Sequence, residues 1–320
     1  MITITLADRS KPLLGKLVID SPPNAAPSEV MAHVEPTPLG ELVRSNWEAI
    51  ASFHPAIRVI GFQLMEEHLH GALYVTRRLS KPLGNIIGGF KGGCTSAYRK
   101  LFPGQGKCPL FAEGFHDRIL FQHGQLDRML NYIRDNPRRS AVKRLFPGYF
   151  QQLREIRFGD GTFVGVGNNF LLDGPFFHQI QASRSITAEE LAEKQKAMLS
   201  AAAAGAVVVS PCISKGEREL ARIAFEHQAS LISLKNQGFS PLYKPSGEMF
   251  DACAEGRVLL LAPSQWPYTA TKKPMTRADA CVLNALAQQI CGANAAAIHY
   301  TGKVPDNLPE LVARAMGRNL

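Results

Sequence analysis

The first half of the chain alternates short apolar runs with amphipathic segments. Residues 2–6 and 15–19 predict a first pair of strands, and residues 57–76 predict a β-hairpin because two apolar, β-branched runs flank a short acidic turn. Apolar residues recur at helical spacing over 39–53, and a glycine-rich helix is expected around 83–102. Strands and helices in this order indicate an antiparallel sheet with helices packed on it, an α+β domain.

A further amphipathic helix is predicted by apolar residues at i, i+3, i+4 and i+7, namely Leu126, Met129, Leu130 and Ile133. Pro137 should end this helix near Asn136. Tyr132 lies at the margin of the apolar stripe, and Asn136 follows one turn later on the same side. The pattern alone is that of an ordinary tyrosine at the edge of a buried face.

The second half shows another pattern, in which short buried strands alternate with helices. The expected strands are residues 206–209, 230–234 and 257–263, and the expected helices are 187–203, 217–228, 247–255, 276–291 and 307–316. This alternation favours a doubly wound parallel sheet, an α/β Rossmann-like domain. We therefore predict a domain over 1–157, a linker over 158–182 and a second domain over 183–320.

His68 and His70 are separated by one residue on the second strand of the expected hairpin. Side chains at i and i+2 of a strand project from the same face, about 7 Å apart along the strand. That spacing suits two imidazole nitrogens converging on one divalent cation. Two polar residues beside a turn are the alternative interpretation.

Three segments together resemble a known family. Residues 62–70, 114–120 and 132–139 occur in the order, and carry the motifs, of the strand with its His pair, the aromatic-acidic-basic segment and the tyrosine helix of single-tyrosine HUH transposases. The closest likeness is to the REP-associated tyrosine transposases and related insertion-sequence enzymes, and it covers residues 1–150.

The HUH resemblance implies a metal-dependent single-stranded DNA endonuclease and strand transferase that acts through a 5′-phosphotyrosine intermediate. Tyr132 would be the nucleophile, and His68, His70 and Asn136 would hold Mg²⁺ or Mn²⁺. The partner would be single-stranded or hairpin DNA, and whether a homodimer shares the site stays open.

Charge agrees with a polyanionic partner. The chain has 36 Lys and Arg against 27 Asp and Glu, a formal charge of +9, and +8 of this lies in residues 1–157. The candidate phosphate contacts are basic pairs in this half: Arg77 and Arg78, Arg99 and Lys100, Arg138 and Arg139, and Lys143 and Arg144.

Cysteine spacing and hydropathy bear on the compartment. The six cysteines form no C-x-x-C pair, and the longest apolar run, residues 201–209, is too short to cross a bilayer. We expect a cytoplasmic protein with reduced cysteines, no zinc site and no membrane partner.

Residues 183–320 faintly resemble the Rossmann-like domain of DprA-type DNA-processing proteins. The resemblance rests on a strand that ends in Ser210, a helix that opens at Gly216 and a late helix that opens at residues 276–280. Pro211 stands where that family has a glycine. Ser210, Ser214, Lys215 and Gly216 are the candidate anion- or nucleotide-binding residues, because a helix N-terminus presents free N–H groups.

Two other functions remain open on the sequence. The protein could be a domesticated DNA-binding protein without cleavage activity, which predicts metal-independent binding and no covalent adduct. It could also be a nucleotide-binding protein that acts through its second half, which predicts a retained mononucleotide.

Overall fold

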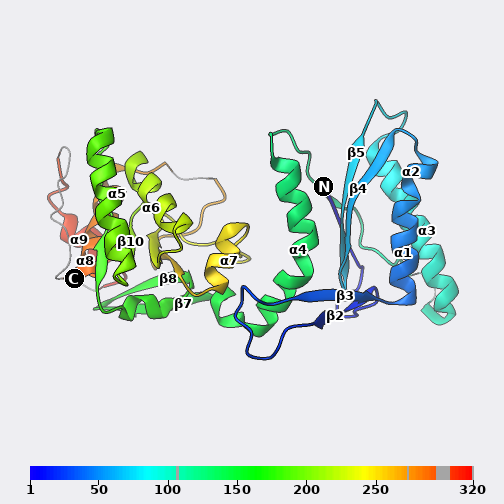
Figure 1. Cartoon of the computed structure of the whole chain (residues 1–320), viewed down its shortest axis with the longest axis horizontal. Coiled ribbons are helices and arrows are strands. Elements are labelled where there is room, and N and C mark those ends of the chain that lie inside the picture. The colour runs from blue at the N-terminus through cyan, green and yellow to red at the C-terminus, as the bar shows by residue number, and fades with distance from the viewer. Residues whose placement is uncertain (106–107, 272–273, 293–302, 319–320) are drawn as a thin grey trace. The chain divides into compact units, whose positions relative to one another are not determined.

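The computed structural model describes residues 1–105, 108–271, 274–292 and 303–318. The chain divides into two compact units, Met1–Leu145 and Phe146–Leu320, and the colours of Figure 1 follow the chain through both. Each unit encloses a hydrophobic core of its own, one built from residues 2–111 and the other from residues 156–316. The sequence prediction placed the end of the first domain at residue 157, twelve residues beyond this division.

The first unit contains an antiparallel sheet in the strand order β4-β5-β1-β6 and a separate hairpin of β2 and β3. Its strands are β1 (Ile2–Thr5), β2 (Gly15–Ile19), β3 (Ala32–Pro36), β4 (Ile57–Leu64), β5 (His68–Val75) and β6 (His116–Asp117). Its helices are α1 (Pro38–Glu48), α2 (Ile50–Phe53), α3 (Leu83–Leu101), the short η1 (Pro103–Gln105) and α4 (Gln125–Leu145).

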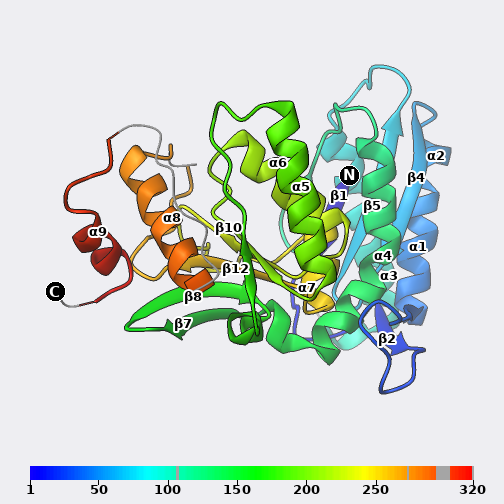
Figure 2. The same cartoon turned by 60° about the vertical axis from the view of Figure 1, so that its left-hand side comes forward.

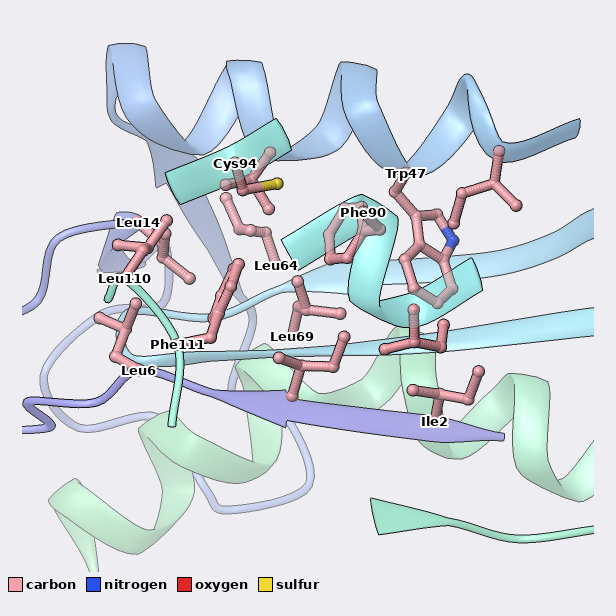
Figure 3. Packing of buried hydrophobic residues seen from close by; sticks show 14 of the residues in the cluster. Ile2, Leu6, Leu14, Trp47, Leu64, Leu69, Phe90, Cys94, Leu110 and Phe111 are labelled. Atoms are coloured by element: carbon pink, nitrogen blue, oxygen red, sulfur yellow. The ribbon is translucent and has the colours of Figure 1, made fainter. Parts of the chain in front are cut away.

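Helices cover both faces of this sheet, with α1 and α3 on one face and α4 on the other (Figure 1). The main core lies under α1 and α3, where Trp47 packs edge-on against Phe90 and Leu69 is fully buried (Figure 3). Because Leu69 points into this core, its neighbours on β5 point toward α4.

The predicted hairpin of residues 57–76 is confirmed as β4 and β5. The predicted pairing of the first two strands is wrong, because β1 pairs with β5 and β6 whereas β2 pairs with β3. Ile2 and Ile4 are both buried, and only a central position in the sheet buries them beside Leu69. Tertiary burial therefore decides the partner of β1.

The predicted end of the tyrosine helix is also wrong. Helix α4 continues through Pro137 to Leu145. A proline in a helix lacks the N–H that would bond to the carbonyl four residues earlier. Pro137, Ala141 and Val142 are buried, so packing of this second half of α4 outweighs the lost hydrogen bond.

The second unit is built on a six-stranded sheet in the order β7-β8-β12-β11-β10-β9. Its strands are β7 (Gln152–Phe158), β8 (Gly161–Gly167), β9 (Phe177–Gln179), β10 (Val207–Ser210), β11 (Leu231–Leu234) and β12 (Val258–Pro263). Its helices are η2 (Pro147–Phe150), η3 (Asn169–Asp173), α5 (Ala188–Ala203), α6 (Lys215–Glu226), α7 (Glu248–Ala254), α8 (Arg277–Cys291) and α9 (Leu308–Ala315). Figure 2 shows α5 and α6 on one side of β10 and α8 on the other.

The strands β10 to β12 are parallel, as the sequence predicts. The sequence did not predict β9, which joins them in parallel, or β7 and β8, which extend the sheet in antiparallel fashion. The segment expected to be a linker, 158–182, therefore carries sheet strands. A prediction from residue propensities misses β8, because this strand is rich in glycine and glycine disfavours strands. The fold requires them: a Cβ at Gly165 would lie 2.7 Å from Ile156, and Gly167 has φ of +115° against the backbone of β12.

Three helices of the second unit begin with a capping box, in which a hydroxyl and a carboxylate satisfy the first N–H groups. Thr187 and Glu190 form the box of α5, Ser214 and Glu217 form that of α6, and Thr276 and Asp279 form that of α8. Within the described ranges, no helix has both the length and the apolar character needed to span a membrane.

Candidate functional site

The hairpin β4–β5 places His68 and His70 on the sheet face opposite the main core. Leu69 between them is fully buried, and the two imidazole centroids lie 4.8 Å apart with the rings nearly perpendicular. The pairing predicted from i and i+2 spacing is thus present in the structure. Two rings at this separation can each present a nitrogen to the same small region.

His70 is buried, with 6% of its surface exposed. Its Nδ1 lies 2.9 Å from Oγ1 of Thr3, the residue opposite it on β1, and one hydrogen bond joins the two atoms. Burial, with a smaller contribution from the charge of His68, lowers the pKa of His70 to about 3. The ring is therefore neutral at neutral pH.

His68 is flanked by the acidic turn. Glu67 Oε1 lies 3.3 Å from His68 Nδ1, which is close enough for an ion pair, although the buried Nδ1 has no partner in good hydrogen-bond geometry within the described chain. This contact with His68, together with Arg9, 3.4 Å from the same oxygen, holds the pKa of Glu67 at about 2. Glu67 is therefore an anion throughout the neutral range.

Helix α4 brings Tyr132 to the histidines from about sixty residues further along the chain. The Tyr132 ring centroid lies 5.7 Å from that of His70. Contacts of the helix with β4, where Leu130 and Ile133 surround Gly61, set this position. The structure thus brings together the three residues that carry the sequence hypothesis.

Asn136 lies one turn beyond Tyr132 on α4. Its amide nitrogen donates to the carbonyl of Tyr132 at 3.0 Å. The amide oxygen takes no part in that bond. Its role as a metal ligand stays a prediction.

The basic residues near the tyrosine differ in how available they are. Asp135 accepts from Arg138 Nε at 2.6 Å and from Arg139 Nε at 2.9 Å. Arg139 is buried, and its guanidinium carbon lies 5.7 Å from the Tyr132 ring centroid, so this residue supports the tyrosine from within the protein. That position differs from the predicted surface contact with phosphate.

The other candidate phosphate contacts lie at several places on the first unit. Arg144 forms an ion pair with Glu66, which ties the end of α4 to the β4–β5 turn, and Lys143 beside it is half-buried. The remaining four candidates are exposed, two after β5 and two in the last turn of α3: Arg77, Arg78, Arg99 and Lys100.

The donors around Tyr132 fit a divalent ion in part. Neutral imidazole is the form that binds metals, and His70 is neutral, with one nitrogen oriented by a hydroxyl as metal-binding histidines commonly are. Centroids 4.8 Å apart allow one nitrogen of each ring to reach a shared ion at about 2.1 Å. Among the residues that the structure describes, no three His, Cys, Asp or Glu side chains form a metal-binding set, so a third ligand would be a group of another kind, such as the amide of Asn136.

The predicted anion cradle of the second unit is occupied by the chain itself. Glu217 is buried at the start of α6, and its carboxylate accepts from the backbone N–H groups of Ile213 at 2.7 Å and of Ser214 at 3.1 Å. The hydroxyl of Ser214 caps the helix, and Gly216 packs against Ala182.

Two other members of the predicted cradle are placed differently. Ser210 is fully buried, and its hydroxyl accepts from the N–H of Cys212 at 3.1 Å; Lys215 is exposed. An internal carboxylate therefore takes the place that the sequence prediction gave to an external anion.

Sequence reasoning missed the roles of three residues. Thr3 and Asp135 are partners of the histidine–tyrosine site in the first unit, and Glu217 fills the predicted anion cradle of the second. Thr3 gives no local signal, because its contact with His70 depends on the pairing of β1 with β5. Asp135 could have been found from its i+3 and i+4 spacing to Arg138 and Arg139. Glu217 could have been found as the third residue of a capping box after Ser214.

No protein-family model matches the chain. An uncharacterized protein of Haemophilus influenzae (strain ATCC 51907 / DSM 11121 / KW20 / Rd) is 25% identical over 122 aligned residues, which cover 31% of this chain and 64% of the relative. The chain therefore spans less than two thirds of the length of this curated relative. The resemblance of residues 1–150 to HUH transposases stays a prediction.

Two solved structures of DNA processing protein A are structural neighbours. The protein from Helicobacter pylori, described as having a unique single-stranded DNA binding mode, shares 18% identity over 44% of this chain and 66% of its own, with a TM-score of 0.33. The protein from Streptococcus pneumoniae shares 16% identity over 46% of this chain and 54% of its own, also with a TM-score of 0.33. These neighbours belong to the family that residues 183–320 resemble in sequence.

Proposed function

We propose that the first unit is a metal-dependent single-stranded DNA endonuclease and strand transferase with Tyr132 as its nucleophile. One observation carries this proposal: α4 holds the Tyr132 ring 5.7 Å from His70, whose ring is 4.8 Å from that of His68. A tyrosine at the edge of a core needs no such neighbours. A phenol beside a pair of imidazoles suits nucleophilic attack on a phosphodiester, because the imidazoles can hold a metal ion that activates the phenol.

In the proposed reaction, the Tyr132 oxygen attacks the scissile phosphorus in line. A bond forms between that oxygen and the 5′-phosphate, the bond to the 3′-oxygen breaks, and the 3′-oxygen takes up a proton to leave a free hydroxyl. The intermediate retains one phosphodiester bond for each that is broken. Attack by another 3′-hydroxyl then restores the strand without a nucleotide triphosphate.

Neither His70 nor Glu67 is a strong base for the phenolic proton. His70, with a pKa of about 3, and Glu67, with a pKa of about 2, both bind protons weakly at neutral pH. A divalent ion held by His68, His70 and Asn136, either Mg²⁺ or Mn²⁺, would polarise the phosphate and favour the phenolate. The buried Arg139 holds the ring in place against the sheet.

We infer a DNA ligand from the charge of this unit. Residues 1–145 contain 19 Lys and Arg against 12 Asp and Glu, so +7 of the total +9 lies here. Basic surfaces of this kind bind the phosphates of a single strand. The exposed arginines 77 and 78, which follow the strand that bears the histidines, are the candidate contacts nearest to them in sequence.

A second candidate is a DNA-binding protein that no longer cleaves its ligand. The absence of a three-residue His, Cys, Asp or Glu set in the described part of the chain favours this candidate. The burial of Arg139 and its pairing with Asp135 also fit a structural role for the tyrosine helix. Both candidates bind single-stranded DNA, so only cleavage distinguishes them.

Covalent trapping separates the two functions. The full chain would be incubated with a 3′-labelled single-stranded oligonucleotide, with Mn²⁺, Mg²⁺ or a chelator, and resolved on a denaturing gel. Tyr132→Phe should abolish the labelled protein adduct and leave DNA binding within about twofold, because only the nucleophilic oxygen is lost. Tyr74→Phe, which alters an exposed tyrosine on β5, is the matched control and should retain the adduct.

The outcomes are distinct. An adduct that survives Tyr132→Phe excludes Tyr132 as the nucleophile. Binding without any adduct, with either ion, identifies the non-cleaving candidate.

A further inference from the structure

The acidic turn between β4 and β5 carries two glutamates whose carboxylates have different partners. Glu66 Oε1 accepts from the backbone N–H of Leu17 at 3.2 Å, and the same carboxylate pairs with Arg144. Glu67 Oε1 instead lies 3.3 Å from Nδ1 of His68. The two carboxylates of this turn therefore act on different parts of the first unit, and that of Glu67 reaches a histidine of the proposed site.

Backbone hydrogen bonds hold this turn in place. The N–H of Met65 donates to the carbonyl of His68 at 2.8 Å, which closes the turn. The N–H of Leu6, directly after β1, donates to the carbonyl of Glu67 at 2.8 Å. Nη2 of Arg9 lies 3.4 Å from the carboxylate of the same glutamate. These contacts restrict the Glu67 carboxylate to the neighbourhood of His68.

The nitrogen that faces this carboxylate is Nδ1 of His68. This atom is buried and has no hydrogen-bond partner in good geometry among the described residues. A neutral imidazole carries its one proton on either nitrogen, and a carboxylate, ionised at neutral pH, can only accept. At 3.3 Å a lone pair on Nδ1 would be repelled by the carboxylate, whereas a proton on Nδ1 would be attracted. The contact therefore favours the tautomer with the proton on Nδ1 and a lone pair on Nε2.

The partner of His70 imposes no such choice. The Thr3 hydroxyl, 2.9 Å from Nδ1 of His70, can either donate to a lone pair or accept from an N–H. Either tautomer of His70 satisfies this contact. The two neighbouring rings, whose centroids are 4.8 Å apart, thus differ, because the surroundings select one tautomer of His68 and leave that of His70 open.

We propose that Glu67 is a positioning residue that fixes the tautomer of His68 and leaves Nε2 as the nitrogen with a free lone pair beside His70. Metal-binding histidines commonly donate their other N–H to a carboxylate, which orients the ring and strengthens the bond to the ion. The step from this tautomer to metal binding rests on the function proposed above, whereas the tautomer itself does not. Glu67 acts through His68 and forms no bond to the reacting phosphate.

The tautomer can be measured directly in the metal-free, full-length chain. With ¹⁵N-labelled histidine, two-bond ¹H–¹⁵N correlation spectra distinguish a ring nitrogen that bears a proton from one that bears a lone pair. His68→Gln identifies the signals of His68 among those of the nine histidines. At about pH 8.5, well above the ordinary histidine pKa, the proton of His68 should prefer Nδ1 by at least about tenfold, the scale of a hydrogen bond to a charged group.

Glu67→Gln tests the role of the carboxylate. The amide has nearly the same shape but can donate as well as accept, so it no longer selects a proton on Nδ1. The preference for Nδ1 should fall by about tenfold. Glu66→Gln is the matched control and should leave the tautomer of His68 unchanged, because that carboxylate faces Leu17 and Arg144.

Manganese binding supplies a second readout. The loss of the free Mn²⁺ signal in electron paramagnetic resonance would give the affinity of the parent chain and of both variants for the ion. Glu67→Gln should weaken binding by about tenfold, the low end of the effect of removing the partner of a metal ligand. Glu66→Gln should bind Mn²⁺ as the parent does.

Each outcome decides a separate point. A proton on Nε2 of His68 in the parent, or a tautomer that a folded Glu67→Gln variant leaves unchanged, overturns the proposal. Equal affinities of the parent and Glu67→Gln for Mn²⁺ overturn its extension to the ion. A parent with the proton on Nδ1 that binds no Mn²⁺ contradicts the metal-dependent function and upholds the role of Glu67. Circular dichroism checks the fold of the variants, and the parent spectrum decides the first point without them.

Discussion

Three buried polar residues of the predicted sites have specific partners. His70 is paired with Thr3, Arg139 with Asp135, and Glu217 with the N–H groups at the start of α6. A buried polar group without a partner costs free energy, so these contacts are part of the stability of the fold as well as of its chemistry. His70 shows this most directly, because its neutral form alone fits its surroundings.

We therefore expect acid to destabilise the first unit through His70. The folded pKa of about 3 lies below the ordinary 6.5, so the unfolded chain binds more protons between these values. The stabilising contribution is complete above pH 6.5 and is lost as the pH falls toward 3. Between pH 6.5 and 4.5 the loss should reach about 2 kcal/mol, at 1.36 kcal/mol for each pKa unit.

Urea unfolding followed by Trp47 fluorescence, in a Trp266→Phe background, would measure this loss. His70→Gln should flatten the profile between pH 6.5 and 4.5. Below pH 4.5, protonation of Glu67 adds a loss of the same sign, because its folded pKa of about 2 is also below the ordinary value. Equal slopes for the parent and His70→Gln would contradict the burial of a neutral ring.

At the scale of elements, close packing positions the histidine strand and the tyrosine helix. Gly71 follows His70 on β5, and a Cβ there would overlap the Trp47 ring of α1. On the other face, Gly61 of β4 receives Leu130 of α4, whose Cδ2 lies 2.7 Å from the place of a Cβ. The two glycines let one helix approach each face of the hairpin that carries the site.

Gly71→Ala should destabilise the first unit by about 1–3 kcal/mol, the range for overpacking a well-filled core. The methyl group must displace Trp47 or shift β5, and a shift of β5 moves His70. Gly88→Ala in α3 is the matched control, because nothing lies within 4 Å of its Cβ position. Helix propensity predicts that the control stabilises the unit by up to about 1 kcal/mol.

Urea midpoints read by Trp47 fluorescence would give both values. A Gly71→Ala variant as stable as the parent would show that the ring can move without cost.

At the scale of the whole molecule, each of the two units has a core of its own. The core of the first unit contains Trp47 and Phe90, and that of the second contains Phe163 and the apolar faces of β10 to β12. The histidine–tyrosine site lies wholly in the first unit. Each unit is of a size that commonly folds alone.

Residues 1–145 and 146–320, produced separately, should therefore each unfold cooperatively in urea. The first fragment should retain single-stranded DNA binding and form any Tyr132 adduct. Circular dichroism, gel shift and covalent trapping on a denaturing gel would measure these three properties. A first fragment that folds but no longer binds DNA would move the DNA interface into the second unit.

The periodic features of the fold could be predicted from the sequence alone. Alternating and helical patterns located the hairpin β4–β5, the three parallel strands β10 to β12 and the helices around them, because burial of one face imposes a period on the residues. The i and i+2 spacing placed His68 and His70 together, and the helical stripe placed Tyr132 at its margin. These properties are local, so neighbouring residues suffice to specify them.

The remaining features depend on contacts between distant parts of the chain. The pairing of β1 with β5, which gives His70 its hydroxyl partner, and the continuation of α4 through Pro137 depend on segments far apart in the chain. So does the burial of Arg139 beneath Tyr132. In each case long-range packing outweighs a local preference, and that balance is absent from any short window of sequence.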